Sequence, residues 1–292
     1  MNALDSTLNL FFPQWQGCGN LGLYRGATLL RQVLDPAKSF AEIPVSSAYS
    51  LAVTQNILGL SQISTQLQAA CSCIQHKNPA RIFTIGGDCG VEIAPVSFLN
   101  QKYGRSLAVI WLDAHGDLNT PSSSPSGHFH GMPLRALLGE GPSTILSQSF
   151  SQLCPEQVFL VGARALDLPE SRFIRQSNLL LFSVEKVNAN RSAELIRSIK
   201  AVGFNKVYVH LDLDVLDPQV FPYTACPTPK GINLESLSVL LTDLKCNFEI
   251  VGASVLEFLL SGDVDFSDAS DKMKERLSFI TESCLREIYF GE

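Results

Sequence analysis

A short apolar run that ends abruptly in charged residues constrains this chain more than any other feature. Residues 107–112 read Leu-Ala-Val-Ile-Trp-Leu, a pattern typical of a parallel strand covered by helices on both faces. Asp113, His115 and Asp117 follow directly. Because strand side chains alternate, these three point to one side, and parallel sheets bind ligands at the carboxyl ends of their strands. The run predicts a buried central strand that ends in a binding site.

A second stretch has the same design. Residues 206–211 predict another buried strand, which leads into Asp212 and Asp214. The two strand ends would bring four aspartates and one histidine into one region. So many carboxylates repel one another in a low-dielectric cleft unless cations bind among them or their pKa values rise. Carboxylate and imidazole ligands suit divalent ions, so the two strand ends predict two metal ions.

The rest of the chain alternates between predicted strands and predicted helices. Further strands are expected at residues 8–12, 81–85, 157–162, 179–184 and 249–256. Helices are expected to open at 26–31 and to extend over 49–75 and 193–202. This alternation predicts a three-layer α/β/α sandwich with a mostly parallel sheet. The chain has 292 residues, of which 46% are hydrophobic, and shows no linker or repeat. We therefore expect a single domain, residues 1–292.

Charge and composition argue against several classes of partner. The formal net charge is -6, and Lys and Arg are not clustered as a nucleic-acid surface requires. Residues 1–13 lack a basic segment with a long apolar core, and no apolar run is long enough to span a membrane. Eight cysteines stand without a paired spacing, which favours reduced thiols. We expect a cytoplasmic protein that binds neither nucleic acid nor membrane.

Four motifs occur together in this chain. They are Gly86-Gly-Asp-Cys89, Asp113-Ala-His-Gly-Asp117, Ser126-Gly-His-Phe-His-Gly-Met-Pro133 and Asp212-Leu-Asp-Val-Leu-Asp-Pro218. Their order and spacing resemble the arginase, or ureohydrolase, family across nearly the whole chain. The resemblance implies an arginase-like fold, a site with two manganese ions, and hydrolysis of a guanidinium to urea and an amine. It also implies a small-molecule guanidino substrate and assembly into a trimer or hexamer.

The resemblance assigns metal ligands by position. One ion would bind Cys89, Asp113, Asp117 and Asp212, and the other Asp113, His115, Asp212 and Asp214. Hydroxide shared by two cations forms near neutral pH and would attack the guanidinium carbon. Glu257 matches the family's acidic residue that binds the guanidinium, and His130 matches the histidine that supplies a proton to the leaving amine. Asp117 is counted with these two as a catalytic residue.

Other matches concern the amino-acid end of the substrate. Asn119, Ser124 and Ser126 stand where arginases contact the α-carboxylate. Asp167 and Glu170 match the acidic residues that recognise the α-amino group. A hydrolase of agmatine has no use for a carboxylate clamp, so these matches favour a substrate with an intact amino-acid head.

Three positions depart from the family. Cys89 stands where the family has histidine, His128 replaces an asparagine that touches the carboxylate, and Cys226 stands where a hydroxyl would approach the guanidinium. A thiolate is softer than imidazole and adds negative charge, so we expect the Cys89 site to bind manganese weakly, to stay empty or to take a softer ion. Activity on plain arginine should then be reduced. N-hydroxyarginine is less basic and easier to attack, which makes it an alternative substrate.

Other interpretations remain open. The chain is either such an amidinohydrolase, an agmatinase or another guanidino-acid hydrolase, or a metal-poor pseudoenzyme with a binding or regulatory role. Cys89 favours the last alternative, whereas the presence of Glu257 and His130 argues against it. Strand alternation points His210 in the same direction as Asp212. We expect His210 to pack in the core or to support the ligands rather than to bind metal itself.

Overall fold

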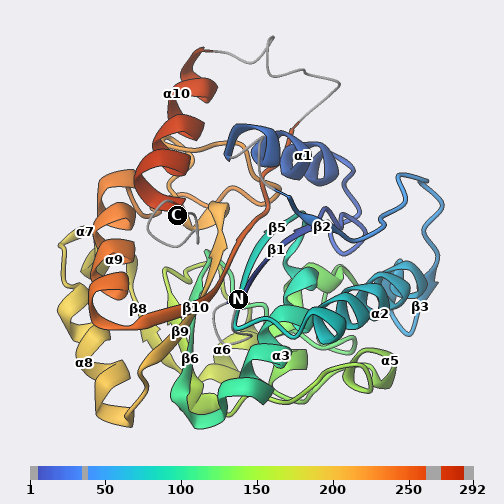
Figure 1. Ribbon diagram of the computed structural model, residues 1–292, viewed down its shortest axis with the longest axis horizontal. Coiled ribbons are helices and arrows are strands. Elements are labelled where there is room, and N and C mark those ends of the chain that lie inside the picture. The colour runs from blue at the N-terminus through green and yellow to red at the C-terminus, as the bar shows by residue number, and fades with distance from the viewer. Residues whose placement is uncertain (1–5, 35–38, 261–270, 286–292) are drawn as a thin grey trace.

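The structure is a computed structural model that describes residues 6–34, 39–260 and 271–285. At its centre lies an eight-stranded sheet with the order β2-β1-β5-β10-β9-β6-β7-β8, in which every neighbouring pair is parallel (Figure 1). The strands of this sheet are β1 Thr7–Phe12, β2 Ala41–Glu42, β5 Arg81–Gly86, β6 Leu107–Leu112, β7 Val158–Val161, β8 Leu180–Phe182, β9 Lys206–Asp212 and β10 Glu249–Leu256. The predicted parallel sheet is confirmed.

Helices cover both faces of the sheet. On one face pack α1 Gly22–Leu34, α7 Val184–Asn188, α8 Ser192–Val202, α9 Leu234–Asn247, α10 Asp271–Phe279 and the π-helix η7 Ile280–Leu285. On the other face pack α2 Leu60–Lys77, α3 Ile93–Tyr103, α4 Pro133–Leu137, α5 Ser143–Leu146 and α6 Leu168–Gln176. Figure 1 shows α8 and α9 to the left of the strands and α2 and α3 to the right. The predicted α/β/α sandwich is confirmed.

Strand β6 illustrates why the sheet is buried on both sides. Its residues Ala108, Ile110 and Leu112 belong to one hydrophobic core, and the alternate residues Leu107 and Val109 belong to the other. All the residues of β6 are buried. An unbroken apolar strand is therefore stable only between two helical layers, as the sequence pattern predicted.

The prediction of a helix throughout residues 49–75 is wrong for its first part. Val53–Thr54 (β3) and Ile57–Leu58 (β4) form a small antiparallel pair, and α2 begins only at Leu60. Gln55 and Asn56 between these strands have positive φ angles of 51° and 60°, which make a tight turn. Apolar spacing alone did not distinguish this hairpin from a helical turn.

The strand register brings distant parts of the chain to one edge of the sheet. Leu112 of β6 pairs with Leu211 of β9, and Leu256 of β10 pairs with Asp212. The residues that follow β6 and β10 are Asp113 and Glu257. Strand β5, on the other side of β10, leads into the short 3-10 helix η1 Cys89–Glu92. Four adjacent strands thus deliver acidic and sulfur side chains to the same place.

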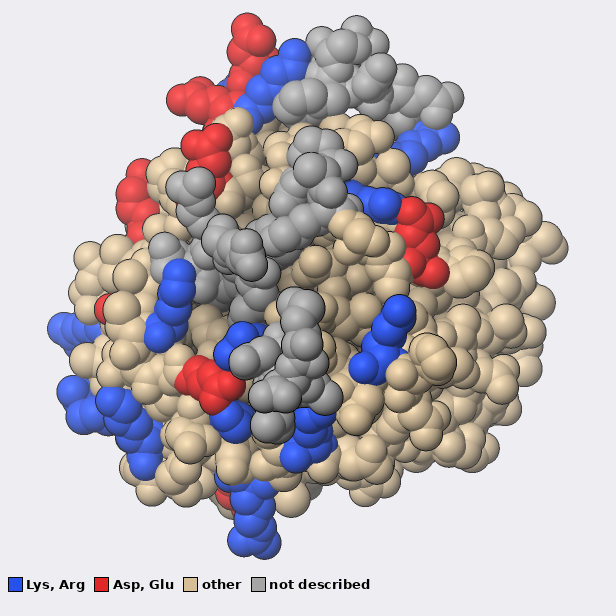
Figure 2. Space-filling model, viewed as in Figure 1, with Lys and Arg blue, Asp and Glu red and all other residues tan. Residues whose placement is uncertain are grey.

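Charges are unevenly spread over the face shown in Figure 2. Charged side chains gather at the top near α10, on the left and below, and the right-hand area toward α2 carries few. The sequence of α2 explains this, because Ser, Gln and Thr fill its polar positions and Lys77 is its one Lys or Arg. Within the described residues, no helix has the length and apolar character that a bilayer span requires.

Candidate metal centre and substrate cavity

A cavity of about 180 Å³ opens at the carboxyl edge of the sheet. It is lined by Cys89, His115, Asp117, Asn119, Ser124, Pro125, Ser126, His130, Gly131, Ala165, Asp167, Glu170, Asp212, Asp214, Cys226 and Glu257. All the predicted site residues except Asp113 and His128 line this cavity. Asp113 is buried and does not line the cavity, and His128 lies outside the lining, with its ring 5.8 Å from that of His130.

The end of β6 holds Asp113 and His115 in a hydrogen-bonded turn. Asp113 Oδ1 accepts from the backbone N–H of His115 at 2.7 Å, and Oδ2 accepts from Trp111 Nε1 at 3.1 Å. His115 Nδ1 lies 3.0 Å from Asp214 Oδ2. Burial disfavours the imidazolium, but the two aspartates outweigh it and raise the pKa of His115 to about 12. Burial alone would raise the pKa of Asp113. The imidazole rings of His115 and His210 outweigh burial and hold the pKa of Asp113 well below its usual value.

Asp117 combines burial, an unpartnered carboxylate oxygen and a left-handed backbone conformation. It is 4% exposed, its Oδ2 is buried without a hydrogen-bond partner, and its φ angle of 53° is rare for a residue other than glycine. Burial, and then the charge of Asp113, raises the pKa of Asp117 well above its usual value. A buried carboxylate oxygen without a donor is destabilising unless something binds it. Asp117 therefore points to a cation in the cavity.

The end of β9 presents two further carboxylates. Asp212 Oδ1 accepts from the backbone N–H of Asp214 at 2.7 Å, and Asp214 Oδ1 accepts from that of Ala114 at 3.1 Å. Burial and mutual repulsion raise the pKa of Asp212 well above normal. The pKa of Asp214 is raised to about 6 by burial and by the charge of Asp113. These shifts show that the carboxylates repel one another, which a dication would relieve.

Sequence reasoning missed Arg164, which fixes the loop after β9. Its guanidinium donates to backbone carbonyls on either side of the loop, including Asp214 O at 3.0 Å, Val215 O at 3.2 Å and Thr228 O at 2.7 Å. A guanidinium carries five N–H donors in a rigid plane and suits such a role. Its position just after Gly162, at the end of β7, was the one available signal.

The turn after β5 places Cys89 beside Asp212. Asp88 organises this turn, since its carboxylate accepts from Gln14 Nε2 at 2.8 Å and from the backbone N–H of Gly90 at 2.9 Å. Cys89 is 1% exposed, and its Sγ lies 3.2 Å from Asp212 Oδ2, which accepts the thiol hydrogen bond. Burial, followed by the nearby carboxylates, raises the pKa of the Cys89 thiol well above its usual value.

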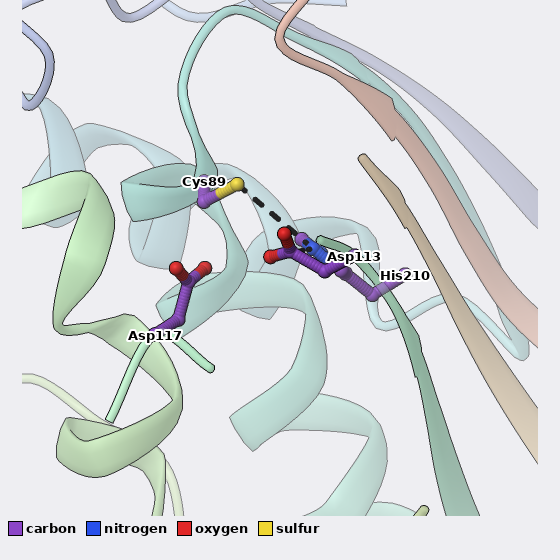
Figure 3. A group of neighbouring side chains, drawn as sticks. All are labelled: Cys89, Asp113, Asp117 and His210. Atoms are coloured by element: carbon purple, nitrogen blue, oxygen red, sulfur yellow. Dashed lines mark hydrogen bonds and ion pairs between the residues drawn. The ribbon is translucent and has the colours of Figure 1, made fainter. Parts of the chain in front are cut away.

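Among the described residues, four groups of side chains are spaced to hold a cation, and two of them contain Asp113. In the first, which we name the Cys89 group, one atom each from Cys89, Asp113, Asp117 and His210 lies within 4.8 Å of the others, and Figure 3 shows these four side chains around a common space. The second, the His115 group, consists of Asp113, His115 and Asp214. Sulfur, nitrogen and oxygen donors with net negative charge fit divalent cations.

The Cys89 group differs from the set that the resemblance implied. His210 is part of it, and Asp212 instead forms a group with Cys89 and Glu257. His210 is fully buried, and its Nε2 lies 3.6 Å from Asp113 Oδ2 and 3.9 Å from Cys89 Sγ. Burial lowers the pKa of His210, but the nearby carboxylates of Asp113 and Glu92 outweigh it and raise the pKa. Sequence alternation placed His210 on the same face of β9 as Asp212. In the structure its ring also lies beside Cys89 and Asp113.

Glu257 and His130 form a pair at the cavity wall. Glu257 Oε1 lies 3.2 Å from His130 Nδ1 and accepts from the backbone N–H of Cys89 at 3.2 Å. The φ angle of Glu257 is 62°, a strained conformation that the hydrogen bond of its N–H to Gly87 O at 2.8 Å helps to hold. Burial lowers the pKa of His130, but the charge of Glu257 outweighs it and raises the pKa.

The residues predicted to bind the amino-acid head are joined by hydrogen bonds. Asn119 Nδ2 donates to Asp167 Oδ2 at 2.8 Å, and Asn119 Oδ1 accepts from Ser123 Oγ at 2.7 Å. Asp167 and Glu170 also form a capping box at the start of α6, so their carboxylates have a structural role. Ser124 and Ser126 lie in the same polar loop, with hydroxyl oxygens 3.5 Å apart.

Comparison with known proteins identifies the family. The arginase family model matches residues 20–272. The arginase of Bacillus caldovelox is 32% identical over 205 residues, which are 67% of this chain and 68% of that protein. The arginase of Staphylococcus aureus strain COL is 39% identical over 153 residues, 51% of this chain and 50% of the relative, so the chain spans about half the length of such relatives.

Solved structures agree. The native structure of arginase from Bacillus caldovelox superposes with a TM-score of 0.81 at 25% identity, covering 99% of both chains. The Entamoeba histolytica arginase in complex with L-ornithine gives a TM-score of 0.83 at 21% identity, again over 99% of both chains, which supports the fold. The family match over most of the sequence, together with this shared architecture, shows that the chain belongs to the arginase family.

Proposed function

We propose that this chain is a metal-dependent amidinohydrolase. Its substrate would be an arginine-like amino acid, arginine or N-hydroxyarginine, which it would cleave to ornithine and urea or hydroxyurea. One observation carries the proposal: a single cavity is lined by carboxylates grouped for cations, by the Glu257–His130 pair and by the polar loop that contains Asn119. Each of these three parts has a task in cleaving a guanidinium that carries an amino-acid head.

The metal-binding part fits two divalent ions, with manganese the metal that family membership favours. The orphaned Oδ2 of Asp117 and the raised pKa values of Asp212 and Asp214 both indicate that positive charge is needed there. Dications held by these residues would lower the pKa of a bound water molecule and so supply a nucleophile near neutral pH. The ligands proposed from the resemblance are Cys89, Asp113, Asp117 and Asp212 for one ion, and Asp113, His115, Asp212 and Asp214 for the other.

Glu257 is suited to bind the guanidinium. Its carboxylate is 2% exposed and is fixed by the backbone N–H of Cys89 and by His130 Nδ1. Carboxylates form charge-assisted hydrogen bonds with the planar N–H groups of a guanidinium, and these bonds also set its orientation. Glu257 would thus hold the reacting carbon toward the carboxylates of the two strand ends.

His130 is suited to move the proton that the reaction requires. When the C–N bond breaks, the departing nitrogen needs a proton to leave as a neutral amine. The pairing with Glu257 raises the pKa of His130, which keeps the ring protonated at higher pH than an isolated imidazole. With Nδ1 facing Glu257, the other ring nitrogen remains available to donate to the amine.

The polar loop would select the amino-acid head. We propose that Asn119, Ser124 and Ser126 contact the α-carboxylate, and that Asp167 and Glu170 contact the α-ammonium. The capping box and the bond from Asn119 already hold these carboxylates in place, which reduces the entropy lost on binding. Because each carboxylate oxygen has two lone pairs, further acceptor capacity remains for an ammonium group.

Two cysteines favour a substrate other than plain arginine. Cys226 lines the cavity where the resemblance places a hydroxyl, and Cys89 brings sulfur into the metal-binding part. Both changes concern the guanidinium end. N-hydroxyarginine has a less basic and more readily attacked guanidinium carbon, so it would tolerate a weaker nucleophile. A metal-poor binding protein is the second candidate, favoured by the thiol of Cys89 hydrogen-bonded to Asp212.

The experiment combines metal analysis with a substrate panel. Purified protein is loaded with manganese, and urea or hydroxyurea release is measured from arginine, N-hydroxyarginine, agmatine and a guanidino acid without an α-amino group. We expect turnover of arginine or its hydroxy form and none of agmatine. Agmatine as the best substrate would overturn the proposed amino-acid selectivity. Binding of arginine without urea release from any compound would support the pseudoenzyme instead.

A further inference from the structure

His210 is a fully buried histidine near the carboxyl end of β9, next to the candidate metal ligands. It lies on β9, and its ring stacks on that of Trp111 of β6, with centroids 3.6 Å apart and an interplanar angle of 11°. Both side chains are fully buried. A buried imidazole needs partners for both ring nitrogens, so the contacts of these two atoms decide what His210 does.

Glu92 holds one of the two nitrogens. Its Oε1 lies 2.8 Å from His210 Nδ1, and the carboxylate is also hydrogen-bonded by Tyr208 Oη at 2.6 Å and by the hydroxyl of Ser254. A carboxylate can only accept, so Nδ1 carries a hydrogen and donates it to Glu92. When a metal displaces the proton on Nε2, that nitrogen presents its lone pair to the ion. A histidine that ligates a metal is oriented in the same way, by a carboxylate on its other nitrogen.

His210 Nε2 faces the Cys89 group. Its neighbours are Asp113 Oδ2 at 3.6 Å and Cys89 Sγ at 3.9 Å, and Figure 3 shows the ring pointing toward them. Both separations are long for a hydrogen bond to oxygen or nitrogen. Zinc binds nitrogen, oxygen and sulfur at about 2.0–2.3 Å, so tetrahedral ligand atoms are separated by about 3.3–3.8 Å. The 3.6 Å separation falls within this range and the 3.9 Å separation lies just above it, so the spacing is closer to that around a shared ion than to direct hydrogen bonding.

Two independent observations complete the case for an ion at this point. Asp117 belongs to the same group, is 4% exposed, and leaves its Oδ2 without a partner among the described residues. Cys89 must lose its proton to bind metal, and Asp212 Oδ2, at 3.2 Å, is placed to accept it. Asp212 would then accept the proton of the Cys89 thiol and would not bind the cation at this site.

We infer that Cys89, Asp113, Asp117 and His210 form a mixed sulfur, nitrogen and oxygen site that takes one zinc-like divalent ion, with His210 Nε2 as a ligand. A thiolate and an imidazole favour zinc or cobalt(II) over manganese. The set differs from that of the proposed function, because His210 stands in place of Asp212. The inference rests on the proposed function in locating the metal there, but it concerns binding alone.

The test uses the full-length chain with cobalt(II) or zinc alone and no guanidino compound. One equivalent of cobalt(II) should give a near-ultraviolet thiolate-to-metal absorption band. His210→Gln should weaken cobalt(II) binding about 100-fold, and Asp212→Asn should weaken it less. Cys71→Ser, which removes a partly buried thiol on α2, is the matched control and should behave as the wild type. Wild-type affinity and spectrum in His210→Gln, or a larger loss in Asp212→Asn, would overturn the inference.

A second measurement needs no variant and covers the case in which His210→Gln fails to fold. Crystals of zinc-loaded wild-type protein are measured at the zinc absorption edge. An anomalous peak about 2.0–2.3 Å from both His210 Nε2 and Cys89 Sγ supports the inference. A peak bound without His210, or no zinc at all, rejects it. Zinc bound as inferred, with no urea released from any substrate, would count against the proposed function alone.

Discussion

The two halves of the candidate metal centre share Asp113 but differ in chemistry and exposure. The His115 group offers oxygen and imidazole donors, and the His115 side chain is 29% exposed. The Cys89 group adds sulfur and is almost wholly buried, with Cys89 at 1% and His210 at 0%. Oxygen and imidazole donors suit manganese, whereas a buried set of donors that includes sulfur suits a zinc-like ion. Under the inference above, one arginase-like scaffold would hold two unlike metal sites.

The largest expected effect comes from the residue that both groups share. Asp113→Asn removes a charge from each group and leaves Trp111 Nε1 and the His115 N–H facing a neutral amide. We expect loss of both ions and a fall in turnover of about 10³-fold, equivalent to about 4 kcal/mol. Metal content and product release check it, with the exposed Glu140→Gln as control. Loss of one ion alone would show that Asp113 serves a single group.

Single-group variants should separate the two halves. Cys89→Ser is expected to lower the affinity for a zinc-like ion about 100-fold and to leave manganese affinity unchanged. His115→Asn is expected to lower the affinity for manganese about 100-fold and to leave the affinity for the zinc-like ion unchanged. Competitive metal titration of both variants measures this. Equal losses for both metals in both variants would mean that the halves act as one site, and the comparison would fail.

A smaller effect is expected from the loop behind the His115 group. Arg164→Met removes the donors to the carbonyls of Asp214 and Thr228, and we expect the free energy of unfolding to fall by about 2 kcal/mol. Manganese binding should weaken more than zinc binding, because Asp214 belongs to the His115 group. Denaturant unfolding and metal titration provide the measurements. Arg276→Met, which loses one exposed contact to Gln219 O, should change neither.

The smallest effect concerns pH. The pKa of His130 is raised in the folded state because the charge of Glu257 outweighs burial. Such a group stabilises the fold fully below the unfolded pKa of about 6.5, and the stabilisation is lost as pH rises through the folded value. The difference in unfolding free energy between wild type and His130→Asn should therefore be larger at about pH 6 than at about pH 9. A difference that grows with pH would contradict the proposed pairing.

The sheet and the metal-binding strand ends were predictable because they depend on local patterns. The unbroken apolar runs at 107–112 and 206–211 require burial on both faces, and alternation places Asp113 with Asp117 and Asp212 with Asp214. A buried set of like charges is too costly without compensation. Fold class and the position of the site follow from these two facts. The details of the resemblance then supplied the substrate residues, whose roles stay predictions.

What could not be predicted depends on contacts between strands. His210 stacks on Trp111 only because of the register between β9 and β6, and Glu92 reaches it from η1 after β5. Neither the register nor that approach is visible in sequence spacing. The many bonds of Arg164 likewise depend on a loop folding back over it. Helix and hairpin were confused near Val53 because the apolar residues Leu51, Leu58 and Ile63 fall roughly at helical spacing, although residues 52–56 are exposed.

The stack of Trp111 on His210 gives the cleft an optical reporter of its own. The chain has 2 tryptophans, and the other, Trp15, packs against Tyr49 instead. A protonated imidazole in van der Waals contact accepts an electron from excited indole and quenches its emission. Zinc has a closed electron shell, and its binding to His210 Nε2 would displace the proton and so remove this quenching. Fluorescence from this one ring should therefore brighten as zinc replaces hydrogen, without any added dye.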